Sequence, residues 1–186
     1  PAVELLRAYR LGDEASDNYI TGAVIDTSVR LTIGATGGRP FFTGARAEKL
    51  QEKWDAWASA CGHQEAESWS EILGIALRAS KVHGDCLAVI DADITGGKVK
   101  LFDADQICDI TDFATWASAR GWEEHRQVAG AVVNPAGQVV GYFVTGHRQT
   151  PAVTSADAEF LPVEICRRIG ERRKISQYRG ESQLLP

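Results

Sequence analysis

The sequence predicts an α+β fold, with helices in the N-terminal half followed by antiparallel strands. The first half places apolar residues at helical spacing, whereas from Asp85 onward apolar and polar residues alternate. Glycine-containing turns separate the alternating stretches, as is typical of hairpins. We therefore divide the chain into a helical part, residues 1–84, and a β-rich part, residues 85–186.

Two helices are expected before the first glycine-rich break. Residues 1–9, PAVELLRAY, gather their apolar side chains on one side, with proline tolerated in the first turn. Residues 16–33, SDNYITGAVIDTSVRLTI, also fit helical spacing. Their many β-branched residues leave a strand open as an alternative, and we prefer the helix. The segment GATGGRP, residues 34–40, then ends this element.

Two further helices have stronger signals. Residues 44–62, GARAEKLQEKWDAWASACG, carry an apolar stripe at i, i+4, i+7 and i+11, formed by Leu50, Trp54, Trp57 and Cys61. In residues 68–84, SWSEILGIALRASKVHG, Ser68 and Glu71 have the spacing of a capping box, in which side chains and backbone amides bond reciprocally. Gly84 is a suitable stop.

The β-rich part predicts two hairpins and a later strand. Residues 85–107 form a hairpin about Gly96–Gly97, where positive φ angles are available. Residues 128–146 form a second hairpin that turns at NPAG, residues 134–137. Between them, residues 111–127 are expected to be a loop with a helical turn. Residues 161–174 give one more strand, which leads into a basic run.

Charge and cysteine usage narrow the class of protein. The chain holds 20 basic and 25 acidic side chains, a formal net charge of −5, which disfavours wrapping of nucleic acid. Its four cysteines lie far apart without a C-x-x-C motif, so buried, reduced thiols are expected. Only Cys61 and His63 have ligand-like spacing, a weak metal signal. We find no apolar stretch long enough to cross a membrane.

Paired aspartates are the main candidates for chemistry. The motif Asp-Ala-Asp occurs twice, at Asp91/Asp93 and Asp103/Asp105, and paired carboxylates can bind a divalent cation. A cross-strand ion pair between Asp93 and Lys100 is the simpler interpretation. The four histidines fall in separate segments and form no recognisable catalytic set. We therefore predict no catalytic residue, no metal site and no cofactor.

A basic run precedes the C-terminal segment. It reads RRIGERRK, and its five cations are Arg167, Arg168, Arg172, Arg173 and Lys174. Five like charges within eight residues repel one another, which favours acidic groups nearby. Carboxylates of a neighbouring subunit or phosphate could supply them, and self-association through complementary patches is preferred.

In chain order, these segments resemble the lambda-type bacteriophage portal protein. The stretch EKWDAWASACG is similar to the tryptophan-bearing helix of that family. The stretch LRASKVHGDCLAVI resembles its helix ending in a charged-Gly-acidic turn before a strand. The stretches KVKLFDADQICD, VAGAVVNPAGQVVGYFVT and FLPVEICR resemble later strands. Finally, ISQYRGESQLLP is similar to the motif G-Q-x-R-G-x-S-x-L, with Ser176 in place of the first glycine. Gln177, Arg179, Gly180, Ser182 and Leu184 keep the motif residues.

Two segments depart from the family pattern. The N-terminal segment lacks the usual Arg-Asn signature, and the strand ICRRIGERRK lacks the usual histidine.

The resemblance implies a structural protein and no enzyme. It implies a homo-oligomeric ring, typically a dodecamer, at the portal vertex of the virion, assembled in the host cytoplasm. Terminase, capsid and head–tail connector proteins would dock on it, and double-stranded DNA would pass through without sequence-specific binding or any membrane. It also implies that the chain is the wing-forming part, ending where the channel-lining stem begins. The expected subunit-interface or stem-base residues are Arg167, Arg168, Arg172, Arg173, Gln177 and Arg179.

Two other classes of function remain open. A stand-alone binding or adaptor module would have no link to a capsid. A metal-dependent enzyme would use the Asp-Ala-Asp pairs, and a metal titration followed by thermal melting would reveal it.

Overall fold

A computed structural model describes residues 2–34, 37–63, 67–91, 96–146, 153–171, 177–180 and 182–184, with the backbone alone for residues 2–6. Its helices are α1 (Ala2–Asp17), α2 (Tyr19–Ile33), α3 (Ala47–Ala58), α4 (Trp69–Val82), the 3-10 helix η1 (Ala104–Gln106) and α5 (Phe113–Ser118). Its strands are β1 (Asp85–Asp91), β2 (Lys98–Asp103), β3 (Arg126–Val128), β4 (Ala131–Val133), β5 (Val139–Val144), β6 (Glu159–Pro162) and β7 (Cys166–Gly170). The predicted α+β class is confirmed.

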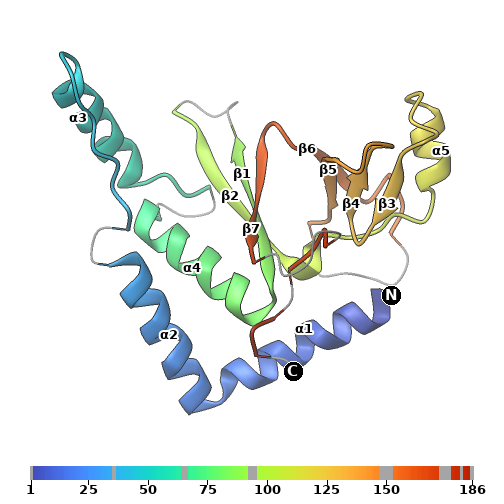
Figure 1. The fold of residues 1–186 in the computed structure, drawn as a ribbon, viewed down its shortest axis with the longest axis horizontal. Coiled ribbons are helices and arrows are strands. Elements are labelled where there is room, and N and C mark those ends of the chain that lie inside the picture. The colour runs from blue at the N-terminus through green and yellow to red at the C-terminus, as the bar shows by residue number, and fades with distance from the viewer. Residues whose placement is uncertain are drawn as a thin grey trace.

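Two antiparallel sheets form the centre of the molecule (Figure 1). One has the strand order β2-β1-β7 and the other β3-β4-β5-β6. Helix α4 packs on the outer face of the first sheet and α2 packs on α4, while α5 lies against the second sheet. Helix α1 runs beneath the sheets. The layers therefore follow the order α2, α4, first sheet, second sheet, α5.

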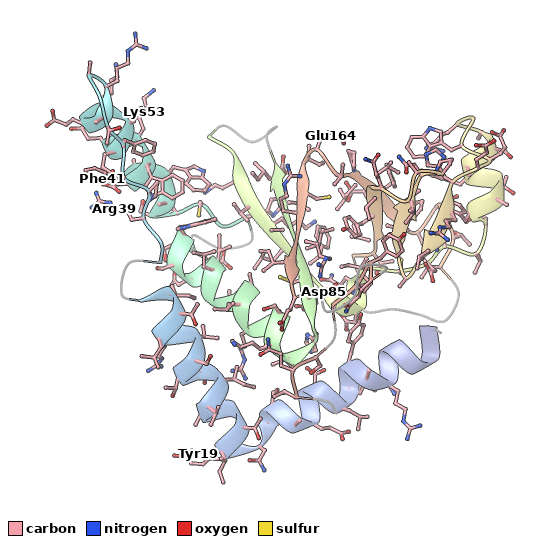
Figure 2. All side chains as sticks on the ribbon, viewed as in Figure 1. Tyr19, Arg39, Phe41, Lys53, Asp85 and Glu164 are labelled. Atoms are coloured by element: carbon pink, nitrogen blue, oxygen red, sulfur yellow. The ribbon has the colours of Figure 1, made fainter. Side chains whose placement is uncertain are left out.

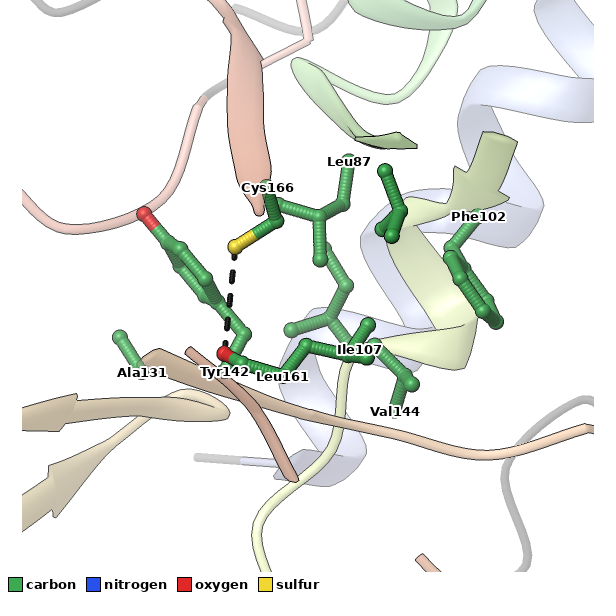
Figure 3. Packing of buried hydrophobic residues seen from close by; sticks show 9 residues of the cluster. Leu87, Phe102, Ile107, Ala131, Tyr142, Val144, Leu161 and Cys166 are labelled. Carbon is green, nitrogen blue, oxygen red and sulfur yellow. Dashed lines mark hydrogen bonds between the residues drawn. The ribbon is translucent and has the colours of Figure 1, made fainter. Parts of the chain in front are cut away.

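The main hydrophobic core lies between the two sheets. Alternation along β1 directs Leu87 and Val89 into this core, where they meet Tyr142 and Val144 of β5. Figure 3 shows this cluster, with the Cys166 thiol 3.8 Å from the carbonyl oxygen of Leu161. All four cysteines are free and buried, as predicted.

Helix α2 settles the ambiguity between helix and strand. Asn18 caps it, because its side-chain oxygen accepts hydrogen bonds from the amides of Ile20 (3.1 Å) and Thr21 (3.5 Å). Ile25 and Val29 then pack against Val82 of α4. Local capping and tertiary packing together outweigh the strand propensity of the β-branched residues.

Helix α3 is shorter than the apolar stripe predicts. It ends at Ala58, so Cys61 lies beyond it, in a segment that runs parallel to β2. The Cys61 carbonyl oxygen accepts a hydrogen bond from the amide of Val99 at 2.8 Å. The helix therefore ends three residues before Cys61, and the pairing with β2 begins at Cys61.

Helix α4 has the predicted capping box. The Ser68 side chain accepts from the amide of Glu71, and the Glu71 carboxylate accepts from the amide of Ser68 at 2.7 Å. Burial of its apolar face against the first sheet and α2 then fixes the helix in place.

The first hairpin has a different register from the one expected. Asp91 faces Lys98 and Val89 faces Lys100, so the predicted pairing of Asp93 with Lys100 is wrong. Gly96 and Gly97 do have positive φ angles, of 93° and 68°, but they directly precede β2 instead of centring the turn. Asp93 itself lies outside the described residues.

Candidate functional site

A buried arginine, Arg179, forms the most extensive polar site of the described chain. Its side chain is 6% exposed, and it faces Asp85, whose side chain is fully buried. Nε lies 2.9 Å from one carboxylate oxygen of Asp85 and Nη2 lies 3.0 Å from the other. This two-point geometry is the strong form of the arginine–carboxylate pair.

The guanidinium group also has acceptors beyond Asp85, and Nη2 is shared among several of them. Nη2 donates to the Tyr9 hydroxyl (2.8 Å) and to the Ala104 carbonyl oxygen (2.7 Å). Nη1 donates to the carbonyl oxygens of Ala129 (2.9 Å) and Ile107 (3.3 Å). These partners come from α1, η1 and the loops beside both sheets. We call Arg179, Asp85 and Tyr9 the arginine junction, since it joins elements from the whole length of the chain.

Local backbone geometry explains why glycines flank the junction. The Gly180 amide donates to Asp85 at 2.7 Å, and this brings residue 180 onto the backbone of Gly84. A Cβ atom at position 180 would lie 1.8 Å from the Gly84 carbonyl oxygen, a distance no side chain can occupy. Gly84 has a φ of 98°, which favours glycine and turns the chain from α4 into β1.

The residues after Gly180 attach the C-terminal segment to the helices. The Gln183 amide donates to the Lys81 carbonyl oxygen at 3.0 Å, near the end of α4. Ser182 is buried, and its hydroxyl accepts from the amide of Leu184 at 3.1 Å. Leu184 packs, partly buried, against the cluster of Ile25, Val29 and Val82. The described part of the R-G-x-S-x-L motif thus has a structural role, since it attaches the C-terminal segment to α2 and α4.

Electrostatics keep Arg179 charged and the Tyr9 hydroxyl neutral. Burial lowers the pKa of Arg179, but the charge and hydrogen bonds of Asp85 outweigh it and hold this pKa above its ordinary value. Burial raises the pKa of the Tyr9 hydroxyl well above its ordinary range. The arginine is therefore protonated and the tyrosine neutral near pH 7. This arrangement suits a structural role better than proton transfer.

The predicted interface residues fall into different environments. Arg168 points inward, with Nη1 3.6 Å from the Asp85 carboxylate, whereas Arg167 is exposed on β7. Gln177, which lies two residues before Arg179 in the sequence, is half-buried, and Arg179 is buried. Arg172, Arg173 and Lys174 lie outside the described residues. The structure thus gives Arg168 an acidic neighbour within its own chain.

The aspartate pairs do not converge on a metal site in the described residues. Asp103 is the N-cap residue of η1, and its amide donates a hydrogen bond to Gln106 Oε1 at 2.9 Å. Asp91 lies 3.6 Å from His63 at the edge of a cleft of about 270 Å³ between the sheets. Among the residues the structure describes, no three histidine, cysteine, aspartate or glutamate side chains are grouped to hold a metal.

Within the described residues, no helix combines the length and the apolar character that crossing a bilayer requires.

Sequence reasoning found Arg179 through its motif but missed its two side-chain partners. Asp85 directly follows the His-Gly turn, and a buried acidic residue that opens an apolar strand is a usable signal. Tyr9 has no comparable signal, because 170 residues separate it from Arg179.

Two of the segments that carry the family resemblance therefore meet in space. The His-Gly-Asp turn after α4 supplies Asp85, and the Arg-Gly-x-Ser-x-Leu segment supplies Arg179. A comparison with curated proteins gave no match. The family model described as phage portal protein, lambda family, matches residues 2–186. The chain therefore belongs to the lambda family of phage portal proteins, which are structural components of the capsid and not enzymes.

Proposed function

We propose that the chain forms the wing of a portal ring, whose central channel carries double-stranded DNA during packaging and ejection. Residues 1–84 and 85–186 would supply the helical and β-rich parts of that wing. Membership of the portal family supports this role. The observation that carries it is the arginine junction, because its polar groups are used to hold elements together.

The charge balance suits a conduit. A formal charge of −5 disfavours tight binding of DNA phosphates to the surface, since such binding depends on many lysine and arginine contacts. A channel that bound phosphate tightly would oppose translocation. DNA would therefore pass without sequence-specific contacts.

The proposed partners are those of a portal vertex. Terminase would dock during packaging, the head–tail connector afterwards, and the capsid shell would surround the ring. Assembly would take place in the host cytoplasm, before the ring becomes part of the virion. Any ATP hydrolysis would belong to the terminase.

Electron microscopy of the complete protein tests the ring directly. We expect closed rings with a channel wide enough for double-stranded DNA, and native mass spectrometry should give one main oligomer. Addition of terminase and DNA should then give ATP-dependent packaging into capsid shells. A protein that stays monomeric under all conditions would contradict the proposal and favour an adaptor module.

The basic run is the second part of the proposal. Arg167, Arg172 and Arg173 would lie at or near the contact between neighbouring copies, while Arg168, Gln177 and Arg179 would support the base of the stem from within. The double variant Arg167→Glu/Arg172→Glu should impair ring assembly, because it reverses two charges at that contact. Arg10→Glu, an exposed arginine on α1, is the matched control. Rings of unchanged yield from the double variant would rule out this placement.

A further inference from the structure

The outward side of α2 is apolar. Ile20, Val24, Thr27 and Leu31 follow the spacing i, i+4, i+7, i+11, and the three large apolar residues are 72%, 63% and 81% exposed. Ile25 and Val29 occupy the opposite side and are buried against α4. We call Ile20, Val24, Thr27 and Leu31 the outer stripe. Its spacing is that of a surface on which another helix packs.

A helix that only faces water would carry charges on this side. Within α2 only Asp26 and Arg30 are charged, and Asp26 pairs with Arg78 of α4. Helix α1 provides the comparison, because the charged side chains of its described part are mostly exposed: Arg7, Arg10, Glu14 and Asp17. Membrane-surface helices and DNA-binding helices are rich in lysine and arginine. The outer stripe therefore fits a protein partner.

Exposed apolar side chains also lie on the arm, which we define as residues 38–58, beside exposed charged residues such as Lys49, Glu52 and Lys53. The arm projects from the rest of the molecule (Figures 1 and 2), and none of the residues of α3, all of which are described, is buried. Phe41 is 88% exposed and Leu50 is 44% exposed. These side chains lack a cover within the described chain.

The arm is held in shape despite its projection. Arg39 forms an ion pair with Asp55, which ties the extended segment to α3. At the base, the Trp57 indole donates to the Gly97 carbonyl oxygen at 3.0 Å. Trp54 and Trp57 pack with ring centroids 5.0 Å apart and ring planes tilted by 48°. A preformed projection loses little conformational entropy when it meets a partner.

We propose that the outer stripe of α2 is a subunit-contact surface that the arm of a neighbouring copy covers. This inference rests on the proposed ring. A ring of identical chains needs two different surfaces that complement each other, one facing each neighbour. The outer stripe is one such surface, and the exposed apolar side chains of the arm, Phe41 and Leu50, provide the other in the single chain.

Cysteine cross-linking tests the contact in the complete protein. The four cysteines of this chain are buried, so an introduced thiol is the accessible one in this part of the protein. Under mild oxidation, Val24→Cys/Phe41→Cys should give a ladder of covalent oligomers, because each copy links to the next. Each single variant should give at least tenfold less cross-linked product. Efficient dimers from Val24→Cys alone would instead mean that two α2 helices face each other, and would overturn the proposal.

Assembly of surface variants separates this inference from the proposed function. Val24→Lys/Leu31→Lys and Phe41→Ser should each reduce ring yield at least tenfold by native mass spectrometry. Ile90→Lys is the matched control, since Ile90 is 57% exposed on β1. Rings of normal yield from all three variants would overturn the contact and leave the ring intact. Absence of rings from the unaltered protein would overturn both.

Discussion

Asp85 is the residue on which the interior depends most. Figure 2 places it at the centre of the molecule, where β1 begins, and its side chain is fully buried. A buried carboxylate is tolerated only when charge and hydrogen bonds compensate for its lost hydration. Arg179 supplies most of that compensation, and Arg168 and the amide of Gly180 supply the rest.

Removal of the arginine should therefore destabilise the fold strongly. Arg179→Met leaves the carboxylate buried without its main partner, and we expect the free energy of unfolding in urea to fall by about 3–5 kcal/mol. Arg167→Met, at an exposed arginine twelve positions earlier, should change it by less than about 0.5 kcal/mol. Similar losses for both variants would show that the pair with Asp85 contributes nothing special.

Gly180 provides a steric test at the same place. Gly180→Ala puts a methyl group where the Gly84 carbonyl oxygen stands, so the backbone must shift, and a loss of about 1–3 kcal/mol is expected. Gly146→Ala is the control, because a Cβ there meets nothing within 4 Å. Equal urea midpoints for the two variants would contradict the close approach.

At the scale of single elements, the start of α4 is the clearest case. Ser68→Ala removes one half of the capping box, and about 1 kcal/mol of unfolding free energy should be lost. Ser118→Ala, at an exposed serine in the last turn of α5, should be nearly neutral. Thermal melting of both variants makes the comparison, and a neutral Ser68→Ala would mean that packing alone sets the start of the helix.

The start of α5 gives a prediction that depends on pH. Asp112 accepts from the Ser155 hydroxyl (2.5 Å) and amide (2.7 Å), and the hydroxyl bond in particular holds the pKa of Asp112 below its ordinary value. A lowered pKa means that this contact stabilises the fold above the unfolded-state pKa and stops doing so as pH falls through the folded-state value. The stability difference between the unaltered protein and Ser155→Ala should therefore shrink between pH 6 and pH 2. A difference that is constant with pH would point to packing instead.

Sequence patterns located most elements but not all of their details. The period of 3.6 residues located α1, α2 and α4, and α2 and α4 each bury one side against a neighbour. The predicted register of the first hairpin is wrong because glycine can adopt a positive φ anywhere in a turn. Gly96–Gly97 therefore could not fix the register. Likewise, the apolar character of Cys61 could not tell a helix from a pairing segment beside β2.

At the scale of the molecule, the sequence predicts the Arg179 half of the site but not its contact with Asp85. The motif around Arg179 was visible, but 94 residues separate it from Asp85, and a single sequence carries no signal for that contact. The acidic partner expected for the basic run was placed in another subunit or in phosphate. For Arg168, the structure instead provides Asp85 within the chain.

The buried thiols report on the whole fold. Burial raises the pKa of Cys86 to about 12 and those of Cys108 and Cys166 to about 11. These groups stay protonated near pH 8, so we expect no reaction with a thiol reagent in the native state and four reactive thiols in urea. Thr43→Cys, at an exposed position on the arm, should react at once and serve as the control. Fast labelling of the unaltered chain would contradict a closed core.

The long span of the arginine junction has a consequence for synthesis on the ribosome. Tyr9 and Asp85 leave the exit tunnel well before Arg179, which lies 170 and 94 residues further along the chain. Until then the Asp85 carboxylate lacks its main counterion, although Arg168 emerges somewhat earlier, and closing the two sheets would bury the charge with only part of its compensation. The nascent polypeptide should therefore remain open until nearly its last described residues have emerged, and a chaperone would have its opportunity during that interval.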